Sequence, residues 1–229
     1  MKYSSTVKGI FKSRLNRFLA RVEIDGKEEF VHVKNTGRCR ELLLPDAEII
    51  LQRSAHPGRK TKYDLITVWK ETLGWVNVDS QAPNRVVHEW LEEKENPFFP
   101  GIKQIKSEYR YGDSRIDFYL ETEDRKILME VKGCTLEIEG TGYFPDAPTL
   151  RGVKHLKELT GAVEQGYECY IAFVIAMPGV NIVEPNRNTH MEFAEALEEA
   201  VKAGVKVLYL GCEVAEDEIF IQRTGIKRK

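Results

Sequence analysis

The chain of 229 residues has no apolar run long enough to cross a membrane and contains only four cysteines. A membrane helix needs about 20 consecutive apolar residues, so we expect no membrane span. The cysteines form no Cys-x-x-Cys pair, which argues against a thiolate zinc site and favours reduced thiols in a cytoplasmic protein. The first 24 residues lack a continuous apolar segment and a small-residue cleavage site, so we also expect no signal peptide.

Charge is nearly balanced over the whole chain, with a formal net charge of −2, but it is unevenly distributed. Residues 1–84 carry 15 Lys and Arg against 10 Asp and Glu, which gives +5, and residues 85–229 carry 19 against 26, which gives −7. A basic first part attracts phosphate groups, and an acidic second part suits carboxylate chemistry. The uneven distribution of charge therefore favours a nucleic-acid partner, which the net charge of the whole chain does not.

The stretch 114–136 predicts two strands joined by a charged turn. Apolar and polar residues alternate in its first half, and a second apolar run ends at Lys132, as expected for half-buried strands. Alternation places Glu130 and Lys132 on one face of the second strand. If the two strands pair, Asp117 lies across from Glu130, so two carboxylates and an ammonium group converge.

Two carboxylates held close together raise each other's pKa unless a cation lies between them. Mg²⁺ and Mn²⁺ are hard cations that prefer such oxygen ligands, so Asp117 and Glu130 are candidate metal ligands. Lys132 is then placed to orient a water molecule or to stabilise charge on a phosphate. The alternative is a surface hairpin whose charged residues are merely solvated. The acidic residue on the neighbouring strand favours the metal site.

Residues 1–83 predict about five short strands with one small helix between them, which suits a small barrel of the OB type. Such barrels hold nucleic acid with basic loops and one sheet face. For any single basic residue, a solvated surface position is the simpler interpretation, but the group as a whole favours nucleic-acid contact. The candidate contacts in this part are Arg14, Arg17, Arg38, Arg40, Arg59, Lys60 and Lys62.

Residues 84–229 predict an α/β domain with a mixed central sheet, so that the chain is α+β overall. Pro83-Asn84 is the predicted domain boundary, and Asn84 is expected to cap a helix from residue 85 to about residue 95. A second helix is expected over residues 150–164, followed by a strongly apolar central strand over residues 168–177.

Several phrases resemble known families. The Asp of SRIDFYL lies thirteen residues before the Glu of MEVKGCTL, and this spacing resembles the core of PD-(D/E)xK nucleases, with Ile116 where that family usually has proline. The longer phrases VHVKNTGRCRELLLPDAEIILQ and YFPDAPTLRGVKHLKEL resemble the sugar fermentation stimulation protein family over nearly the whole chain. The resemblance implies a DNA-binding protein with an OB-like barrel (residues 1–83) and a restriction-endonuclease-like domain (residues 84–229). It leaves open whether DNA is cut.

The resemblance also implies roles for the two predicted helices. The first helix of a nuclease core often contributes an acidic residue, and Glu89 is the candidate for a third metal ligand and catalytic residue. The second helix often brings polar or basic groups towards the scissile phosphate. Arg151 is therefore a candidate nucleic-acid contact, and His155 a candidate catalytic residue.

We predict a DNA-binding protein without strong sequence preference that carries a Mg²⁺- or Mn²⁺-dependent nuclease-like site, and hence a phosphodiesterase. One alternative is a DNA-binding protein of transcription regulation whose nuclease core is inactive. A second alternative is a metal enzyme that acts on a phosphorylated small molecule. The oligomeric state is left open, with a homodimer as one alternative.

Overall fold

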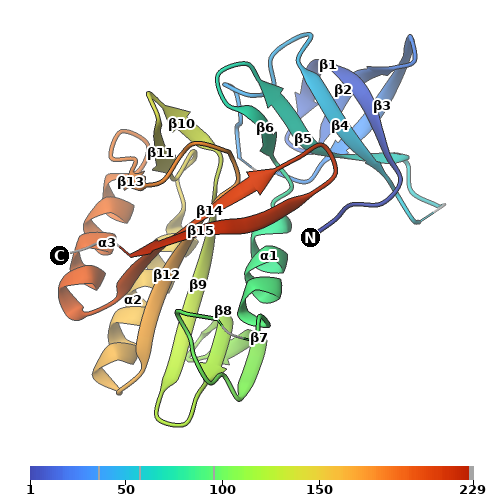
Figure 1. Cartoon of the computed structure of the whole chain (residues 1–229). Coiled ribbons are helices and arrows are strands. Elements are labelled where there is room, and N and C mark those ends of the chain that lie inside the picture. The colour runs from blue at the N-terminus through green and yellow to red at the C-terminus, as the bar shows by residue number, and fades with distance from the viewer. Residues whose placement is uncertain (36, 57, 95, 227–229) are drawn as a thin grey trace.

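The computed structural model describes residues 1–35, 37–56, 58–94 and 96–226 (Figure 1). Its first part is a sheet with the strand order β3-β2-β1-β4-β5-β6. The parallel pairing of β3 with β5 closes this sheet into a five-stranded barrel and confirms the predicted OB-like fold. The strands are β1 (Thr6–Asn16), β2 (Leu19–Ile24), β3 (Lys27–Val33), β4 (Glu48–Arg53), β5 (Tyr63–Lys70) and β6 (Gly74–Asn77).

The barrel interior is filled by alternate residues of its strands. Ala20 and Val22 on β2 are fully buried, as are Val31 and Val33 on β3. Successive side chains of a strand point to opposite faces, so the residues between these four face outward and remain partly exposed. Arg21 of β2 and His32 of β3 are therefore directed towards the surface of the barrel.

The second part is built on a six-stranded mixed sheet with the order β15-β14-β12-β9-β8-β7. Strand β12 is parallel to both β9 and β14, and the other pairs are antiparallel. This arrangement confirms the predicted α/β domain with a mixed sheet. The main elements are α1 (Ala82–Leu91), β7 (Gln104–Tyr111), β8 (Ser114–Glu121), β9 (Lys126–Cys134), α2 (Leu150–Glu164), β12 (Glu168–Ile175), α3 (Met191–Ala203), β14 (Lys206–Val214) and β15 (Ile219–Ile226).

Helices cover both faces of this sheet. Cys169, Ile171 and Phe173 of β12 belong to the same hydrophobic cluster as residues of α2 and α3. Tyr170 and Ala172, between them, belong to the cluster that contains α1. The doubly covered strand explains the long apolar run in the sequence. A small sheet of β10 (Leu136–Ile138), β11 (Thr141–Phe144) and β13 (Val183–Pro185) completes this part.

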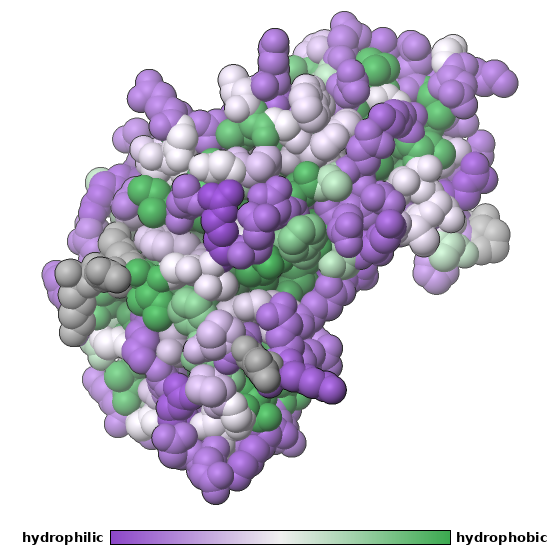
Figure 2. All heavy atoms as spheres, in the orientation of Figure 1, coloured by the Kyte–Doolittle hydropathy of each residue, from purple (hydrophilic) through white to green (hydrophobic). Residues whose placement is uncertain are grey.

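Polar residues cover most of the molecular face drawn in Figure 2, and apolar residues appear there in small groups. Among the described residues, no helix combines the length and the apolar character needed to span a bilayer.

Helix α1 begins earlier than predicted. It starts at Ala82, with Pro83 in its first turn, and its N-cap Gln81 makes no side-chain capping hydrogen bond. Proline suits the first turn of a helix because its φ angle is preset and it has no N–H to leave unpaired. The prediction that Asn84 caps this helix is therefore wrong. The helix ends at Leu91, before the predicted end, and residue 95 lies outside the described residues.

Candidate active site

The two candidate carboxylates lie where β8 and β9 separate. Backbone pairing between these antiparallel strands ends at Phe118 and Met129. Asp117 and Glu130 are the next opposing residues, so they lie across from each other just beyond the paired segment. At this point the backbone N–H of Val131 donates a hydrogen bond to Oδ2 of Asp117, at 2.7 Å. The strand separation therefore leaves room for side chains between the two backbones.

Asp117 is held from the helix side as well. Nδ2 of Asn84, on α1, donates to Oδ1 of Asp117 at 2.7 Å. Both oxygens of Asp117 are thus oriented, one by a backbone N–H and one by an amide. The sequence pattern did not predict this contact, because Asn84 was interpreted as a helix cap. The only feature of the sequence that could have indicated this contact is the polar side chain of Asn84 in the first turn of the helix.

Glu130 is bound through one oxygen and unpartnered at the other. Its Oε1 contacts Nδ1 of His155, from α2, and Nζ of Lys132, two residues further along β9. Its Oε2 is buried and has no hydrogen-bond partner among the described residues. A buried oxygen without a partner is costly, so this atom is a candidate ligand for a cation.

His155 is buried, with 3% of its surface exposed. Nε of Arg151 donates to Nε2 of His155 at 3.3 Å. If Nε2 accepts that bond, Nδ1 carries the proton and donates to Glu130. His155 therefore holds the carboxylate of Glu130 through its Oε1, and the hydrogen bond from Arg151 orients the imidazole ring of His155.

The pKa values of the two carboxylates shift in opposite directions. Burial raises the pKa of Asp117 to about 6, and the negative charge of Glu130 adds to this shift. Burial also acts to raise the pKa of Glu130, but the hydrogen bond from His155 and the charge of Lys132 outweigh it, so the pKa of Glu130 is lowered. A cation between the two would stabilise the charged form of both.

These groups line a hollow of about 700 Å³, which we call the carboxylate hollow. Arg85 also lines it, a residue that the sequence analysis did not single out. Glu108, on β7, lies opposite Asp117 in the strand register and also lines the hollow. The full lining is Ser80, Gln81, Asn84, Arg85, Glu108, Asp117, Glu130, Val131, Lys132 and Arg151. Within the described part of the chain, no group of three or more His, Cys, Asp or Glu is arranged to hold a metal ion.

The structure does not bring Glu89 to this hollow. Its carboxylate forms an ion pair with the amino group of Met1 at 2.6 Å, and the side chain is 55% exposed. The preceding turn of the same helix supplies Asn84 and Arg85 to the carboxylate hollow instead. The placement does not support the prediction of Glu89 as a third ligand, because Glu89 lies one helical turn beyond Arg85 and its carboxylate is paired with Met1 outside the hollow.

Two predicted nucleic-acid contacts are occupied by internal bonds. The guanidinium group of Arg14 donates to five backbone carbonyls, at distances from 2.7 to 3.3 Å. Arginine has five N–H donors, so none remains for a phosphate. Arg59 donates through both terminal nitrogens to the buried carboxylate of Asp64, at 3.1 and 2.8 Å. We correct both predictions, because these side chains hold the barrel together.

The other predicted basic contacts differ in their availability. Lys62 pairs with Glu29 at 3.2 Å on the exposed surface. Within the described ranges, four of the predicted contacts form no side-chain ion pair or hydrogen bond, and each is exposed. They are Arg17, Arg38, Arg40 and Lys60.

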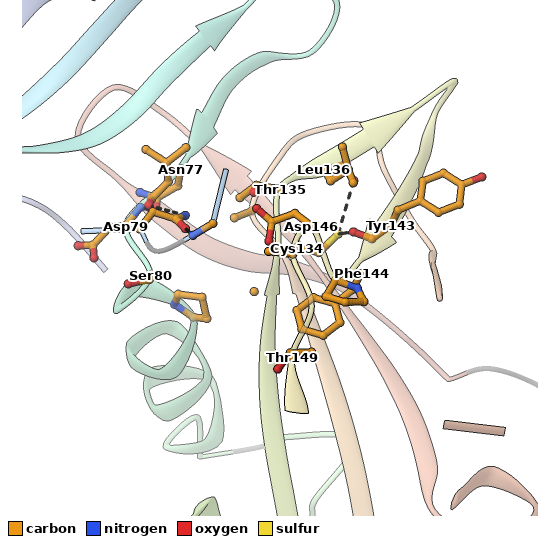
Figure 3. A pocket seen from close by; sticks show the side chains of 18 of the residues that line it. Asn77, Asp79, Ser80, Cys134, Thr135, Leu136, Tyr143, Phe144, Asp146 and Thr149 are labelled. Atoms are coloured by element: carbon orange, nitrogen blue, oxygen red, sulfur yellow. Dashed lines mark hydrogen bonds between the residues drawn. The ribbon is translucent and has the colours of Figure 1, made fainter. Parts of the chain in front are cut away.

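A second hollow, of about 390 Å³, lies between the barrel and the α/β part, and we call it the central hollow. Figure 3 shows Asn77, Asp79 and Ser80 on one side of it and Thr135 and Asp146 on the other. Oδ2 of Asp146 accepts a hydrogen bond from the backbone N–H of Arg38 at 2.9 Å. The two parts of the chain are therefore in direct contact beside this hollow.

The family model described as the sugar fermentation stimulation protein RE domain matches residues 81–218, and the SfsA N-terminal OB domain model matches residues 13–78. A sugar fermentation stimulation protein homolog of Desulfitobacterium hafniense is 55% identical over 219 residues, which cover 96% of this chain and 94% of that protein. The homolog of Ruminiclostridium cellulolyticum is 51% identical over 223 residues, 97% of each chain. The solved structure of Pyrococcus furiosus SfsA in complex with Ca²⁺ has a TM-score of 0.88 at 30% identity, and the match covers 98% of this chain and 96% of that one.

Proposed function

Because the chain belongs to the sugar fermentation stimulation protein family, we propose that it binds DNA and hydrolyses phosphodiester bonds with a divalent metal ion held by Asp117 and Glu130. The observation that carries the proposal is the buried, unpartnered Oε2 of Glu130, a residue that lies across from Asp117 in the strand register and lines the carboxylate hollow with it. The Ca²⁺ complex of Pyrococcus furiosus SfsA supports a divalent cation. Mg²⁺ or Mn²⁺ is our choice for the working ion, because both suit carboxylate ligands.

The donor set fits such an ion. Mg²⁺ is commonly held by one or two carboxylates together with water and substrate phosphates, so Asp117 and Glu130 suffice without Glu89. A divalent ion here would supply a Lewis acid for the phosphate group. Glu108, at the rim of the same hollow, is the remaining carboxylate within the lining.

The neighbouring residues would orient the two carboxylates and assist the reaction. Asn84 and the N–H of Val131 hold Asp117 in place, and His155 holds Glu130. Lys132 presents an ammonium group on the same strand face and would stabilise negative charge on the reacting phosphate. We therefore assign His155 a positioning role, and not the direct catalytic role that the sequence suggested.

DNA binding would come from the basic side chains at the surface and at the hollow. Among the described residues, Arg17, Arg38, Arg40 and Lys60 have no internal partner on the barrel. Arg85 and Arg151 line the carboxylate hollow, where Arg151 also donates to His155. Attraction between such groups and phosphates is independent of base sequence and is weakened by salt. We therefore propose that the protein binds DNA with little preference for base sequence.

A second candidate is a DNA-binding regulatory protein that does not cut DNA. It is favoured by the ion pair between Lys132 and Glu130, which already compensates the charge of that carboxylate. It is also consistent with the limited number of acidic and histidine ligands within the described residues. In this case the carboxylate hollow would be a structural remnant.

One experiment separates the two candidates. Labelled DNA is incubated with the wild-type protein and with Asp117→Asn, Lys132→Ala and Glu89→Gln, in Mn²⁺ and in EDTA. We expect cleavage by the wild type and by Glu89→Gln in Mn²⁺ only, and a loss of at least 100-fold in the other two variants. Cleavage that persists in Asp117→Asn and Lys132→Ala would refute the proposed site. Salt-sensitive binding by the wild type without any cleavage would support the regulatory alternative.

A further inference from the structure

Three hollows of the molecule adjoin one another. The central hollow shares Ser80, Asn84 and Val131 with the carboxylate hollow. On its other side it shares Arg17 and Ala147, among other residues, with a third hollow of about 570 Å³, which we call the barrel-side hollow. The three hollows therefore lie in a row from the barrel surface to Asp117 and Glu130, and we call this row the path.

The barrel-side end of this path is basic. Arg14, Arg17, Arg38 and Arg40 line the barrel-side hollow. The guanidinium of Arg14 is consumed by backbone carbonyls. Those of the other three have no partner within the described part of the chain. Three arginines without partners at one hollow attract a polyanion.

The backbone beside these arginines is fixed by hydrogen bonds from both parts of the chain. Arg14 donates to the carbonyls of Asn35, Gly37 and Arg38 from within the barrel. Asp146, from the α/β part, accepts the N–H of Arg38. Asn35, Gly37 and Arg38, which line the path, are therefore held by hydrogen bonds from the barrel and from the α/β part.

The central hollow is too small for double-stranded DNA. Its volume of about 390 Å³ is near the lower end of the range, about 300–1,000 Å³, that encloses one small molecule. One unpaired nucleotide matches this size, whereas a base pair with its two backbones does not. The smallest hollow of the path therefore suits one unpaired nucleotide and not a base pair.

The charges inside the central hollow also indicate which part of a nucleotide would enter. Asp79 and Asp146 line it, so a phosphate there would meet like charge. The ring of Phe144 lines the same hollow and offers an apolar surface on which a base can stack. Cationic groups lie at both ends of the path, with Arg38 and Arg40 at one end and Lys132 at the other, and Arg17 lies at the junction of the barrel-side and central hollows.

We propose that this path holds a single unpaired DNA strand, with one base in the central hollow and the flanking phosphates at the basic ends. The inference rests on the proposed function, since it names the preferred substrate of that site as DNA with an unpaired segment. A strand that enters from the barrel side is led directly to the two carboxylates.

The test uses three labelled DNAs of one sequence: a single strand, a blunt duplex, and a fork with unpaired arms. Binding is measured by fluorescence anisotropy at low salt in Ca²⁺. Ala147→Trp fills the junction between the central and barrel-side hollows, and Ser80→Trp fills the junction with the carboxylate hollow. Ala203→Trp, on the exposed end of α3, is the matched control. Circular dichroism spectra establish that all variants fold.

We expect the wild type to bind the single strand and the fork at least tenfold more tightly than the blunt duplex. In Ala147→Trp and Ser80→Trp this preference should be lost, with duplex affinity unchanged, and in Ala203→Trp it should be retained. Equal wild-type affinity for all three DNAs, or an unchanged preference in both blocking variants that fold, would overturn the inference.

The same DNAs separate this inference from the proposed function through cleavage in Mn²⁺. Cleavage of the blunt duplex as readily as the fork would overturn the path and leave the hydrolytic site standing. Absence of cleavage, together with a single-strand preference that the blocking variants abolish, would leave the path standing and refute hydrolysis. Absence of binding to all three DNAs would overturn both.

Discussion

Asp117 and Glu130 occupy opposing positions on β8 and β9 immediately beyond the last backbone pair of these strands. The two carboxylates are close in space but differ in their surroundings. Asp117 accepts hydrogen bonds from neutral donors only, whereas Glu130 contacts a lysine and a histidine. Their pKa values therefore shift in opposite directions, and this difference can be measured.

We predict that Asp117→Asn makes the metal-free protein more stable at neutral pH. The pKa of Asp117 is raised from 3.8 to about 6, so the folded state binds more protons than the unfolded state between these values. Its stabilising contribution is complete below about pH 4 and is lost as the pH rises through 6. Asparagine does not ionise, so the variant does not lose stability as the pH rises. Its free energy of unfolding should therefore exceed that of the wild type by on the order of 2 kcal/mol at pH 8. Urea unfolding in EDTA at pH 4 and pH 8 measures the difference.

Glu130→Gln is the matched control, and it should show the opposite sign. The pKa of Glu130 is lowered, so its contribution is present above the ordinary glutamate range and is lost as the pH falls through the folded value. The variant should therefore be less stable than the wild type at pH 8, with a smaller difference in acid. If both substitutions change stability in the same direction at pH 8, the two carboxylates are not in the environments described.

Strand periodicity was sufficient to predict the central part of the site. In a strand, alternation alone determines which side chains share a face, so Asp117, Glu130 and Lys132 could be placed from the sequence. The helices could not be treated in this way. Which helical residue meets the carboxylates depends on how α1 is rotated about its axis and how far it is shifted along the sheet, and packing determines both. Asn84 was therefore missed and Glu89 was chosen instead.

His155→Ala should weaken metal binding without removing any proposed ligand. His155 contacts Oε1 of Glu130 and so fixes the orientation of the carboxylate, whose Oε2 has no partner among the described residues. Loss of a residue that orients a ligand typically lowers metal affinity about 10- to 100-fold, and we expect such a loss for Ca²⁺ and Mn²⁺ in titration calorimetry. His155→Asn, whose amide can replace the Nδ1 donor, should restore part of the affinity. Equal affinity in wild type and His155→Ala would show that His155 does not position Glu130.

Basic residues of the barrel illustrate a further limit of sequence interpretation. A count of Lys and Arg indicates where a polyanion is attracted, but it does not reveal which side chains are engaged internally. Arg14 and Arg40 are equivalent in such a count. In the structure, Arg14 is bound to five carbonyls, and Arg40 has no partner among the described residues.

This contrast predicts opposite behaviour for two substitutions. Arg14→Lys should lower the free energy of unfolding by about 2 kcal/mol, because one ammonium group cannot replace hydrogen bonds to five carbonyls, two of which are partly buried. Arg40→Gln should leave stability within about 0.5 kcal/mol of wild type but reduce the slope of log affinity for DNA against log salt by about 1. Urea unfolding and anisotropy titrations at several salt concentrations measure the two effects. A stable Arg14→Lys protein, or an unchanged salt slope in Arg40→Gln, would contradict these roles.

Arg59 and Lys60 are adjacent and should also differ. Asp64 lies at the parallel pairing of β3 with β5 that closes the barrel. Its buried carboxylate accepts from Arg59, and it also pairs with His32 at 3.0 Å and with Lys34 at 3.3 Å. Burial acts to raise the pKa of Asp64, but these partners outweigh it and the pKa is lowered. Its stabilising contribution is therefore lost when the pH falls below the ordinary aspartate range.

We predict that Arg59→Ala lowers the melting temperature strongly, because the substitution leaves a buried carboxylate with weaker compensation, at a cost of about 3 kcal/mol. Lys60→Ala should not change the melting temperature and should weaken DNA binding to a similar degree for all sequences. Thermal unfolding at pH 7 and DNA titrations measure both variants side by side. If Arg59→Ala unfolds at the wild-type temperature, Arg59 does not brace the closure of the barrel and its guanidinium returns to the set of candidate phosphate contacts.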